Sequence, residues 1–169
     1  MIISVDRLCN SNLNAKNLFK AINEHAISLI NYHIGLQHLE PADFAAIDQE
    51  VRLSLIKHIV LLKHGCKERL YLQRNEMGRG LHSVEMKSEC MLLELWETLK
   101  KCKNISFRRA AILKVEEQEK THLFLIKNYL RVRYSLEDVS VKSVINVQHD
   151  SLYGKINKKN YMRSCIERA

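Results

Sequence analysis

Only one proline and five glycines interrupt the 169 residues of this chain. Antiparallel sandwiches and barrels need a turn about every 8–12 residues, so this scarcity of turn-forming residues predicts a mainly helical fold. No apolar run approaches the roughly 18 residues of a membrane span, and no basic stretch followed by an apolar core marks a signal peptide. With 46% hydrophobic and 27% charged residues, the composition excludes a disordered or low-complexity chain.

Motifs of catalysis and metal binding are missing as well. The five cysteines are widely and irregularly spaced, which argues against a disulfide framework and favours a reducing, intracellular setting. Neither GxxxxGK[ST] nor HExxH nor GxSxG occurs, and the eight histidines are scattered. Asp48 is a lone carboxylate in a helical pattern, so it cannot support two-metal catalysis, and we expect it to face solvent. The sequence thus predicts no catalytic residue, cofactor or metal in this chain.

The positive charge lies entirely in the C-terminal three-fifths of the chain. Residues 1–65 carry six basic and six acidic side chains, so the net charge of +8 belongs to residues 66–169. A basic half favours a polyanionic partner, most often nucleic acid. The same charge on a solvated surface would serve solubility alone, and charge by itself does not separate the two interpretations.

Helical periodicity dominates both halves of the chain. Apolar residues recur at spacings of three and four in residues 14–35, and Pro41 opens a second such pattern that runs to Leu62. Because the connection between them is short, we expect these two helices to pack antiparallel. After residue 82, Ser83 is a good N-cap, and a capping box of the form S-x-x-[DE] begins at Ser135. The corresponding helices are expected at 83–99, 106–120, 121–134 and after 138, with weak patterning and fraying over 155–169.

Residues 69–81 break the helical pattern. Arg69 to Arg74 alternate polar and apolar side chains, the period of a strand, and Gly78 and Gly80 follow as residues able to adopt a positive φ. We therefore predict a mainly α fold, an antiparallel helical bundle interrupted by one short β-hairpin near residues 69–81.

Three motifs stand in a definite order between residues 18 and 84. They are Leu29-Ile-Asn-Tyr-His-Ile-Gly35, Ile47-Asp-Gln-Glu-Val-Arg-Leu-Ser-Leu55 and Arg69-Leu-Tyr-Leu-Gln-Arg-Asn-Glu-Met-Gly-Arg-Gly-Leu81. Together they resemble the region after the palm in non-LTR (LINE-type) retrotransposon reverse transcriptases, with its xxYHxG turn, (I/L)DxxVRxxL helix and LYLPRxxGGRGL hairpin. Two positions depart from the family's pattern: Gln73 replaces a proline, and Met77 replaces a glycine that would adopt a positive φ easily.

The resemblance implies part of an RNA-directed DNA polymerase without its active site. Residues 1–66 would be a thumb-like helical hairpin, 67–82 the β-hairpin and 83–169 a basic helical connector. The catalytic palm, with any divalent metal, would precede Met1. The implied partners are an RNA or RNA–DNA duplex and that missing palm, with no membrane, and the implied place is the nucleus when the chain acts within the intact element.

Basic runs and the resemblance together nominate a set of side chains for sequence-independent, salt-sensitive contacts with phosphates. The set is Arg52, Lys57, Lys63, Lys67, Arg69, Arg74, Arg79, Lys100, Lys101, Lys103, Arg108 and Arg109. For Arg52 the ordinary alternative is an intrahelical pair with Asp48. Sequence-specific readout is not predicted, because no helix-turn-helix, zinc-finger or RNP pattern is present.

The alternative function is a helical protein-interaction or dimerisation module with no role in nucleic-acid binding. Its natural contact set would be Met86, Met91, Leu92 and Trp96, although a stripe of methionine and leucine is more often core.

Overall fold

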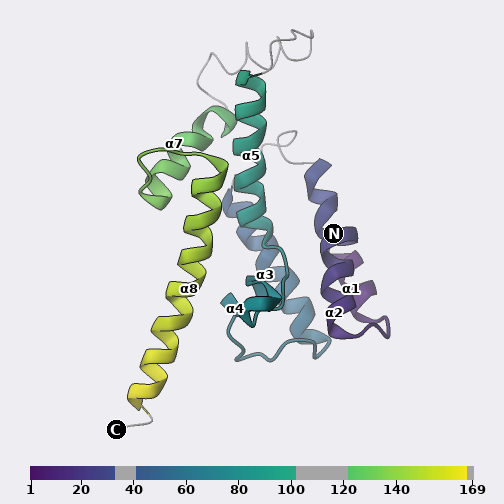
Figure 1. The fold of residues 1–169 in the computed structure, drawn as a ribbon. Coiled ribbons are helices and arrows are strands. Elements are labelled where there is room, and N and C mark those ends of the chain that lie inside the picture. Colours follow the sequence, from purple (N-terminus) through teal and green to yellow (C-terminus); the bar gives the residue numbers. More distant parts are fainter. Residues whose placement is uncertain (33–40, 102–121, 167–169) are drawn as a thin grey trace.

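Helices make up most of the computed structural model, which describes residues 1–32, 41–101 and 122–166 (Figure 1). The mainly α prediction is therefore confirmed. The α-helices are α1 (Ile2–Cys9), α2 (Ala15–Ala21), α3 (Pro41–Lys57), α4 (Glu68–Tyr71), α5 (Val84–Lys101), α7 (His122–Tyr134) and α8 (Val141–Ile166). A π-helical turn η1 (Ile22–Ala26) and a 3-10 turn η2 (Ile27–Tyr32) continue α2, and a 3-10 turn η3 (Arg74–Glu76) follows α4. None of the helices in these ranges has the length and apolar character needed to cross a bilayer.

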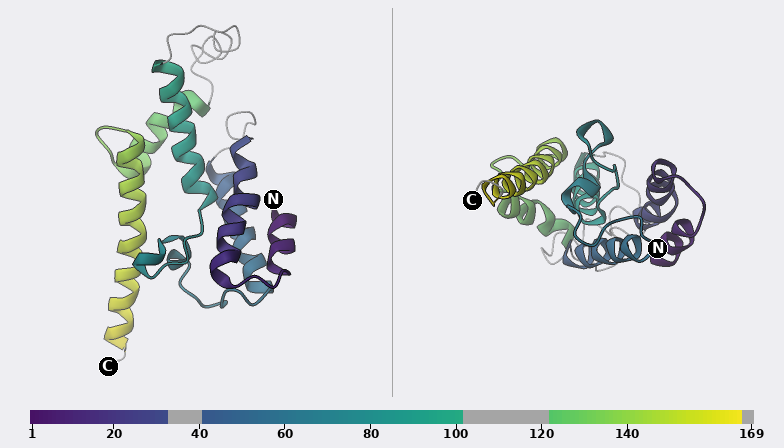
Figure 2. Two further views of the ribbon diagram at one scale, coloured as in Figure 1. Left: turned by 45° about the vertical axis from the view of Figure 1, so that its right-hand side comes forward. Right: turned by 90° about the horizontal axis from the view of Figure 1, so that it is seen from below.

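The central element is α5. It packs against α3, α7, α8 and η2. Figures 1 and 2 show α7 and α8 on one side of α5 and the N-terminal helices α1 and α2 on the other, with the C-terminal end of α8 projecting beyond the bundle. The loop that contains α4 and η3 lies at the N-terminal end of α5.

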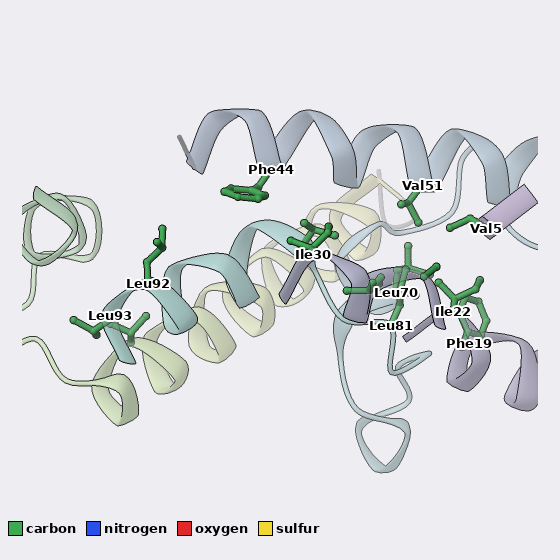
Figure 3. Packing of buried hydrophobic residues seen from close by; sticks show 14 of the residues in the cluster. Val5, Phe19, Ile22, Ile30, Phe44, Val51, Leu70, Leu81, Leu92 and Leu93 are labelled. Carbon is green, nitrogen blue, oxygen red and sulfur yellow. The ribbon is translucent and has the colours of Figure 1, made fainter. Parts of the chain in front are cut away.

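The larger of two buried hydrophobic clusters among the described residues joins helices from both halves of the chain. It includes Val5 of α1, Phe44 of α3, Leu92 of α5 and Val144 of α8. Figure 3 shows Leu70 of α4 in the same cluster as Phe19 and Ile22 of the N-terminal run. The segments 1–66, 67–82 and 83–169 therefore share buried apolar surface.

The N-terminal run α2–η2 is not among the main neighbours of α3. The principal neighbours of α3 are α5 and α1, a short helix that the sequence patterns did not indicate. Asp6 of α1 contributes to this contact: its carboxylate accepts a hydrogen bond from Ser54 Oγ in the last turn of α3 and lies 3.1 Å from Nε2 of His58, the residue after α3. The polar face of α1 is thus used to hold α3.

Helix α3 begins at Pro41 as predicted but ends at Lys57, short of Leu62. Ile59 adopts a left-handed conformation with φ of 58°, and the N–H groups of Ile59 and Val60 bond back to the carbonyls of Ile56 and Leu55. This is the usual way to close a helix, although the left-handed position normally carries glycine. Because the chain turns here, the side chain of Ile59 is 86% exposed instead of extending the buried stripe.

The β-hairpin predicted near residues 69–81 is wrong, since the described residues contain no strand and this segment holds α4 and η3. The chain does reverse direction, but by another route. α4 is a single turn, so its carbonyls lack intrahelical donors, and the returning backbone supplies them. The N–H groups of Arg79, Leu81 and Gly80 donate to the carbonyls of Arg69, Leu70 and Leu72 at 2.9, 3.0 and 2.8 Å.

Two glycines in this loop have different roles. A Cβ on Gly78 would stand 2.0 Å from the Leu72 carbonyl oxygen, so only glycine lets the two backbones approach. Gly80 has a positive φ of 72°, as the sequence allowed. Met77, for which we expected difficulty with a positive φ, nevertheless adopts one of 57°.

Serines cap two of the helices in the second half, α5 and α8. Ser83 caps α5 as predicted, with Met86 N–H donating to its hydroxyl at 3.2 Å. The capping box predicted at Ser135 is wrong: that residue ends α7 with φ of 52°, and Ser140 caps α8 by accepting from Ser143 N–H. Fraying over 155–169 is not seen as far as Ile166, where α8 ends. The helix expected at 106–120 lies outside the described residues.

Alanine substitution should separate these backbone roles. Gly78→Ala should lower the free energy of unfolding by about 2–3 kcal/mol, because the new Cβ overlaps the Leu72 carbonyl. Gly154→Ala is the matched control: it lies within α8 with nothing within 4 Å of the new Cβ, so it should raise stability by about 0.5–1 kcal/mol. Urea unfolding followed by circular dichroism measures both, and equal effects would contradict the loop geometry.

Candidate functional site

Asp48 of α3 fixes the point at which α5 begins. Its carboxylate accepts hydrogen bonds from Ser83 Oγ at 2.6 Å, Val84 N–H at 2.8 Å and Glu85 N–H at 3.1 Å. The expectation that Asp48 faces solvent is wrong, because the residue is buried. Burial raises the pKa of Asp48, and the three hydrogen bonds oppose that rise. A buried carboxylate is tolerated here since the free N–H groups of a helix start are its partners.

The loop between α4 and α5 is also held from the N-terminal side. Asn23 Nδ2 donates to the Gly80 carbonyl at 2.8 Å, and Asn23 Oδ1 accepts from His82 N–H at 2.9 Å. One amide side chain thus satisfies two backbone groups almost sixty residues away in sequence. Asp48 and Asn23 together set the position of the returning segment 79–83.

An open surface pocket of about 390 Å³ lies between this loop and the chain that follows α3. Arg69, Arg74 and Arg79 all line it and all are exposed. No aspartate or glutamate lines it, and within the described residues none of the three arginines forms an ion pair. We call it the triarginine pocket; its other lining residues are Val60, Leu61, Leu62, Gly65, Cys66, Leu70, Met77 and Gly78.

The acidic residues that interleave with these arginines in sequence are directed elsewhere. Glu68 is buried, and its carboxylate accepts from Cys66 Sγ. Glu76 Oε1 lies 2.8 Å from His149 Nε2 of α8. Residues 67–82 carry four basic and two acidic side chains, and the segment presents only positive ones to the pocket.

The remaining predicted residues of the first half are near this region but do not line the pocket. Lys63 and Lys67 are exposed, and each is next in sequence to a residue that lines the pocket. Lys57 Nζ lies 4.0 Å from Asp6 Oδ2, in an exposed and weak pair. Arg52 does not pair with Asp48, whose carboxylate is occupied by the start of α5, and its Nε is buried without a hydrogen-bond partner among the described residues.

The basic residues at the end of α5 form a separate group. A helix rises about 1.5 Å per residue, so the ends of the 18-residue α5 lie about 26 Å apart. Lys101 pairs with Glu97 at 2.8 Å, and Lys100 lies over the Trp96 ring, which Lys127 also approaches. Lys103, Arg108 and Arg109 lie outside the described residues. The structure thus gathers Arg69, Arg74 and Arg79 but separates them from Lys100 and Lys101.

The contact set proposed for a protein-interaction module belongs to the interior. Leu92 is fully buried, and Met86, Met91 and Trp96 are half-buried against the core clusters. These residues hold α5 within the bundle, so they do not form an exposed docking stripe.

A buried polar cluster on α5 was missed by the sequence analysis. Glu89 is fully buried; its Oε2 accepts from Tyr134 Oη at 2.7 Å and Gln148 Nε2 at 2.8 Å, and its Oε1 lies 2.6 Å from Arg133 Nη1. Arg133 also pairs with Glu85 at 2.6 Å. The cluster links α5 to α7 and α8. The signal for it was local: Glu89 precedes Leu92 and Leu93 by three and four positions, which places an acid on the apolar face.

A second, mostly apolar cavity of about 340 Å³ adjoins this cluster between the α4 loop, α5 and α8. Its one thiol, Cys90, lies 3.6 Å from Gln148 Oε1, and burial raises the pKa of this thiol to about 11. A thiol with such a pKa is a poor nucleophile at neutral pH. No group of three or more His, Cys, Asp or Glu side chains within the described ranges is arranged to hold a metal ion.

Fold and site together define an all-helical bundle with a basic surface pocket at one end of its central helix. Comparisons of the chain with protein-family models, with curated proteins and with solved structures found no match. The assignment of a function therefore depends on the geometry of the pocket and on the sequence motifs.

The buried Glu89 should make stability depend on pH in a defined direction. Burial raises the pKa of Glu89 above its ordinary 4.5, so the folded protein binds a proton at pH values where the unfolded chain does not. This contribution to stability is present at low pH and is lost as the pH rises through the raised pKa. The free energy of unfolding of the wild type minus that of Glu89→Gln should thus grow as the pH falls from about 7 to about 5.

Urea unfolding at several pH values measures this difference. Glu94→Gln, an exposed position on the same helix, is the matched control and should leave the pH dependence of the wild type unchanged. A difference for Glu89→Gln that stays constant, or shrinks toward acid, would contradict the argument.

Proposed function

We propose that this chain binds nucleic acid through its phosphates at the triarginine pocket, as a non-catalytic part of the reverse transcriptase of a non-LTR mobile element. The observation that carries the binding proposal is the gathering of Arg69, Arg74 and Arg79 around one pocket that no acidic side chain of the described ranges lines. The order of the three motifs between residues 18 and 84 supports the origin. In the intact element the palm would be the neighbour of this chain, and the complex would act in the nucleus.

Arginine is suited to such a site for physical reasons. Its guanidinium is always charged at neutral pH and presents a planar fork of donors that matches two phosphate oxygens. Contacts to phosphates carry no base information, so the binding should be independent of sequence and should weaken steeply with salt.

The separation of the two basic groups sets a length for the ligand. Bases follow at about 3.4 Å along each strand of B-form DNA, so an extended ligand must reach about eight base pairs to contact both ends of α5. Shorter ligands should depend on the triarginine pocket alone, whereas longer ones should add contacts near Lys100 and Lys101.

A second candidate function has one observation in its favour. Ile59, Leu62 and Met77 are 86%, 76% and 80% exposed, and two of them line the triarginine pocket. Exposed apolar side chains that lie together mark interaction sites, so an acidic protein segment with apolar residues is the alternative occupant. Dimerisation or capture of such a segment without any affinity for nucleic acid would favour it.

Charge reversal tests the binding proposal. Arg69→Glu/Arg74→Glu/Arg79→Glu should weaken binding to a labelled 20-base-pair RNA–DNA hybrid at least about 100-fold at low salt, since each charge-assisted contact contributes about 1.5–3 kcal/mol. The slope of log affinity against log salt should also decrease by about one per arginine. Fluorescence anisotropy across a salt series measures both quantities.

The control variant is Lys16→Glu/Lys142→Glu/Lys155→Glu. It changes the net charge by the same amount at exposed helical positions that line neither pocket. Equal losses in the two triple variants would mean that only the total charge matters. Absence of binding by the wild type at low salt would overturn the proposal.

A further inference from the structure

The triarginine pocket has an apolar surface in addition to its cations. Apart from the arginines, its lining is mainly aliphatic, with Leu61, Leu62, Leu70 and Met77 among the contributing residues, and no aromatic ring of the described residues lines it. Leu62 and Met77 are 76% and 80% exposed and line the same pocket, and exposed apolar side chains that are grouped in this way mark interaction sites. A site for phosphates alone needs only the guanidinium groups, so these aliphatic side chains call for a ligand with an apolar part.

The two kinds of nucleic acid differ in what they present to such a pocket. A duplex presents phosphates and sugars outward, while its base faces are stacked on each other. An unpaired nucleotide presents a phosphate together with a flat base whose faces are free, and such bases stack on guanidinium planes or lie against apolar side chains. Only the second ligand uses both the arginines and the aliphatic surface.

We propose that the triarginine pocket receives one unpaired nucleotide of a single strand or of the overhang of a duplex. The arginines hold its phosphate, and its base lies over Leu62 and Met77. This inference rests on the proposed function and narrows it to single-stranded nucleic acid. The volume of about 390 Å³ lies within the range of sites that take one small molecule, which agrees with a single nucleotide.

Two glycines and a turn in the chain explain why side chains do not fill this pocket. Gly65 and Gly78 both line it, and neither carries a side chain that would fill it. Gly78 is fixed there because its backbone lies against the Leu72 carbonyl. The turn at Ile59 directs the segment 60–62 to the pocket instead of continuing α3. Loop geometry, arginines and aliphatic side chains therefore meet at one place.

The test compares three labelled ligands by anisotropy at one salt concentration: a 12-residue oligouridylate, a blunt 12-base-pair RNA duplex, and that duplex with a four-uridylate 3′ overhang. The single strand and the overhang duplex should bind about tenfold or more tightly than the blunt duplex. Electrostatics alone predicts the opposite order, because the duplex has the higher charge density.

Variants of the aliphatic surface make the test specific. Leu62→Ser/Met77→Asn should weaken binding of the single strand about tenfold and leave the blunt duplex unchanged. Both side chains are exposed, and asparagine tolerates the left-handed conformation of Met77, so the fold should persist. The control, Leu53→Ser/Val132→Ser, changes two exposed apolar residues away from the pocket and should leave every affinity unchanged.

The outcomes separate the two proposals. If no ligand binds at low salt, the proposed function fails and this inference fails with it. If the blunt duplex binds as tightly as the single strand, or if Leu62→Ser/Met77→Asn has no effect on the single strand, the inference is overturned while phosphate binding stands. Loss of all three ligands in the arginine triple variant, combined with the expected preference, supports both.

Discussion

The hydrogen bonds from the start of α5 to Asp48 are the constraint on which the rest of the structure depends. They join α3 to the first turn of the helix that contacts α3, α7 and α8, and they set the end of the loop that carries the arginines. Removing a carboxylate from water is costly, but here a hydroxyl and two backbone N–H groups at a helix start replace the lost water. Because those free N–H donors occur only at the start of a helix, the contact with Asp48 fixes where α5 begins relative to α3.

A second buried acid extends the same logic along α5. Glu89 connects α5 to α7 through Tyr134 and Arg133, and to α8 through Gln148. In this basic protein, several acidic side chains thus form contacts that hold helices together. Asp48, Glu89 and Glu76 all have partners within the fold, and none of the acids in the described part of the chain lines the pocket of the arginines. The positive charge of the triarginine pocket therefore depends on where the acidic side chains are bound within the bundle, in addition to the net charge of the chain.

Local signals in the sequence predicted what local forces decide. Pro41 and Ser83 start helices where expected, since capping involves residues within one turn. The apolar face of α5 could have indicated that Glu89 is buried, but the partners of Asp48 and Glu89 were beyond such reasoning, because Ser83 and Gln148 lie 35 and 59 positions away. The segment 69–81 was predictable in part. Its glycines indicated that the chain reverses direction. The six alternating residues, however, are compatible with a strand and equally with one helical turn followed by extended chain. The sequence identified the arginines as candidate phosphate ligands. It did not show which basic residues would line one pocket, because that depends on the conformation of this loop.

The arrangement of the cations limits how any polyanion can be recognised. A continuous basic track would bind a duplex along its length and would be insensitive to local shape. Here the arginines lie in the loop before α5 and the lysines at its far end, so the length of α5, about 26 Å, stands between them, and that helix is covered by α3, α7 and α8. Recognition at the triarginine pocket must then be decided by what lies within it. Since that interior is aliphatic, the shape and the apolar part of the ligand, in addition to its charge, determine which nucleic acid fits.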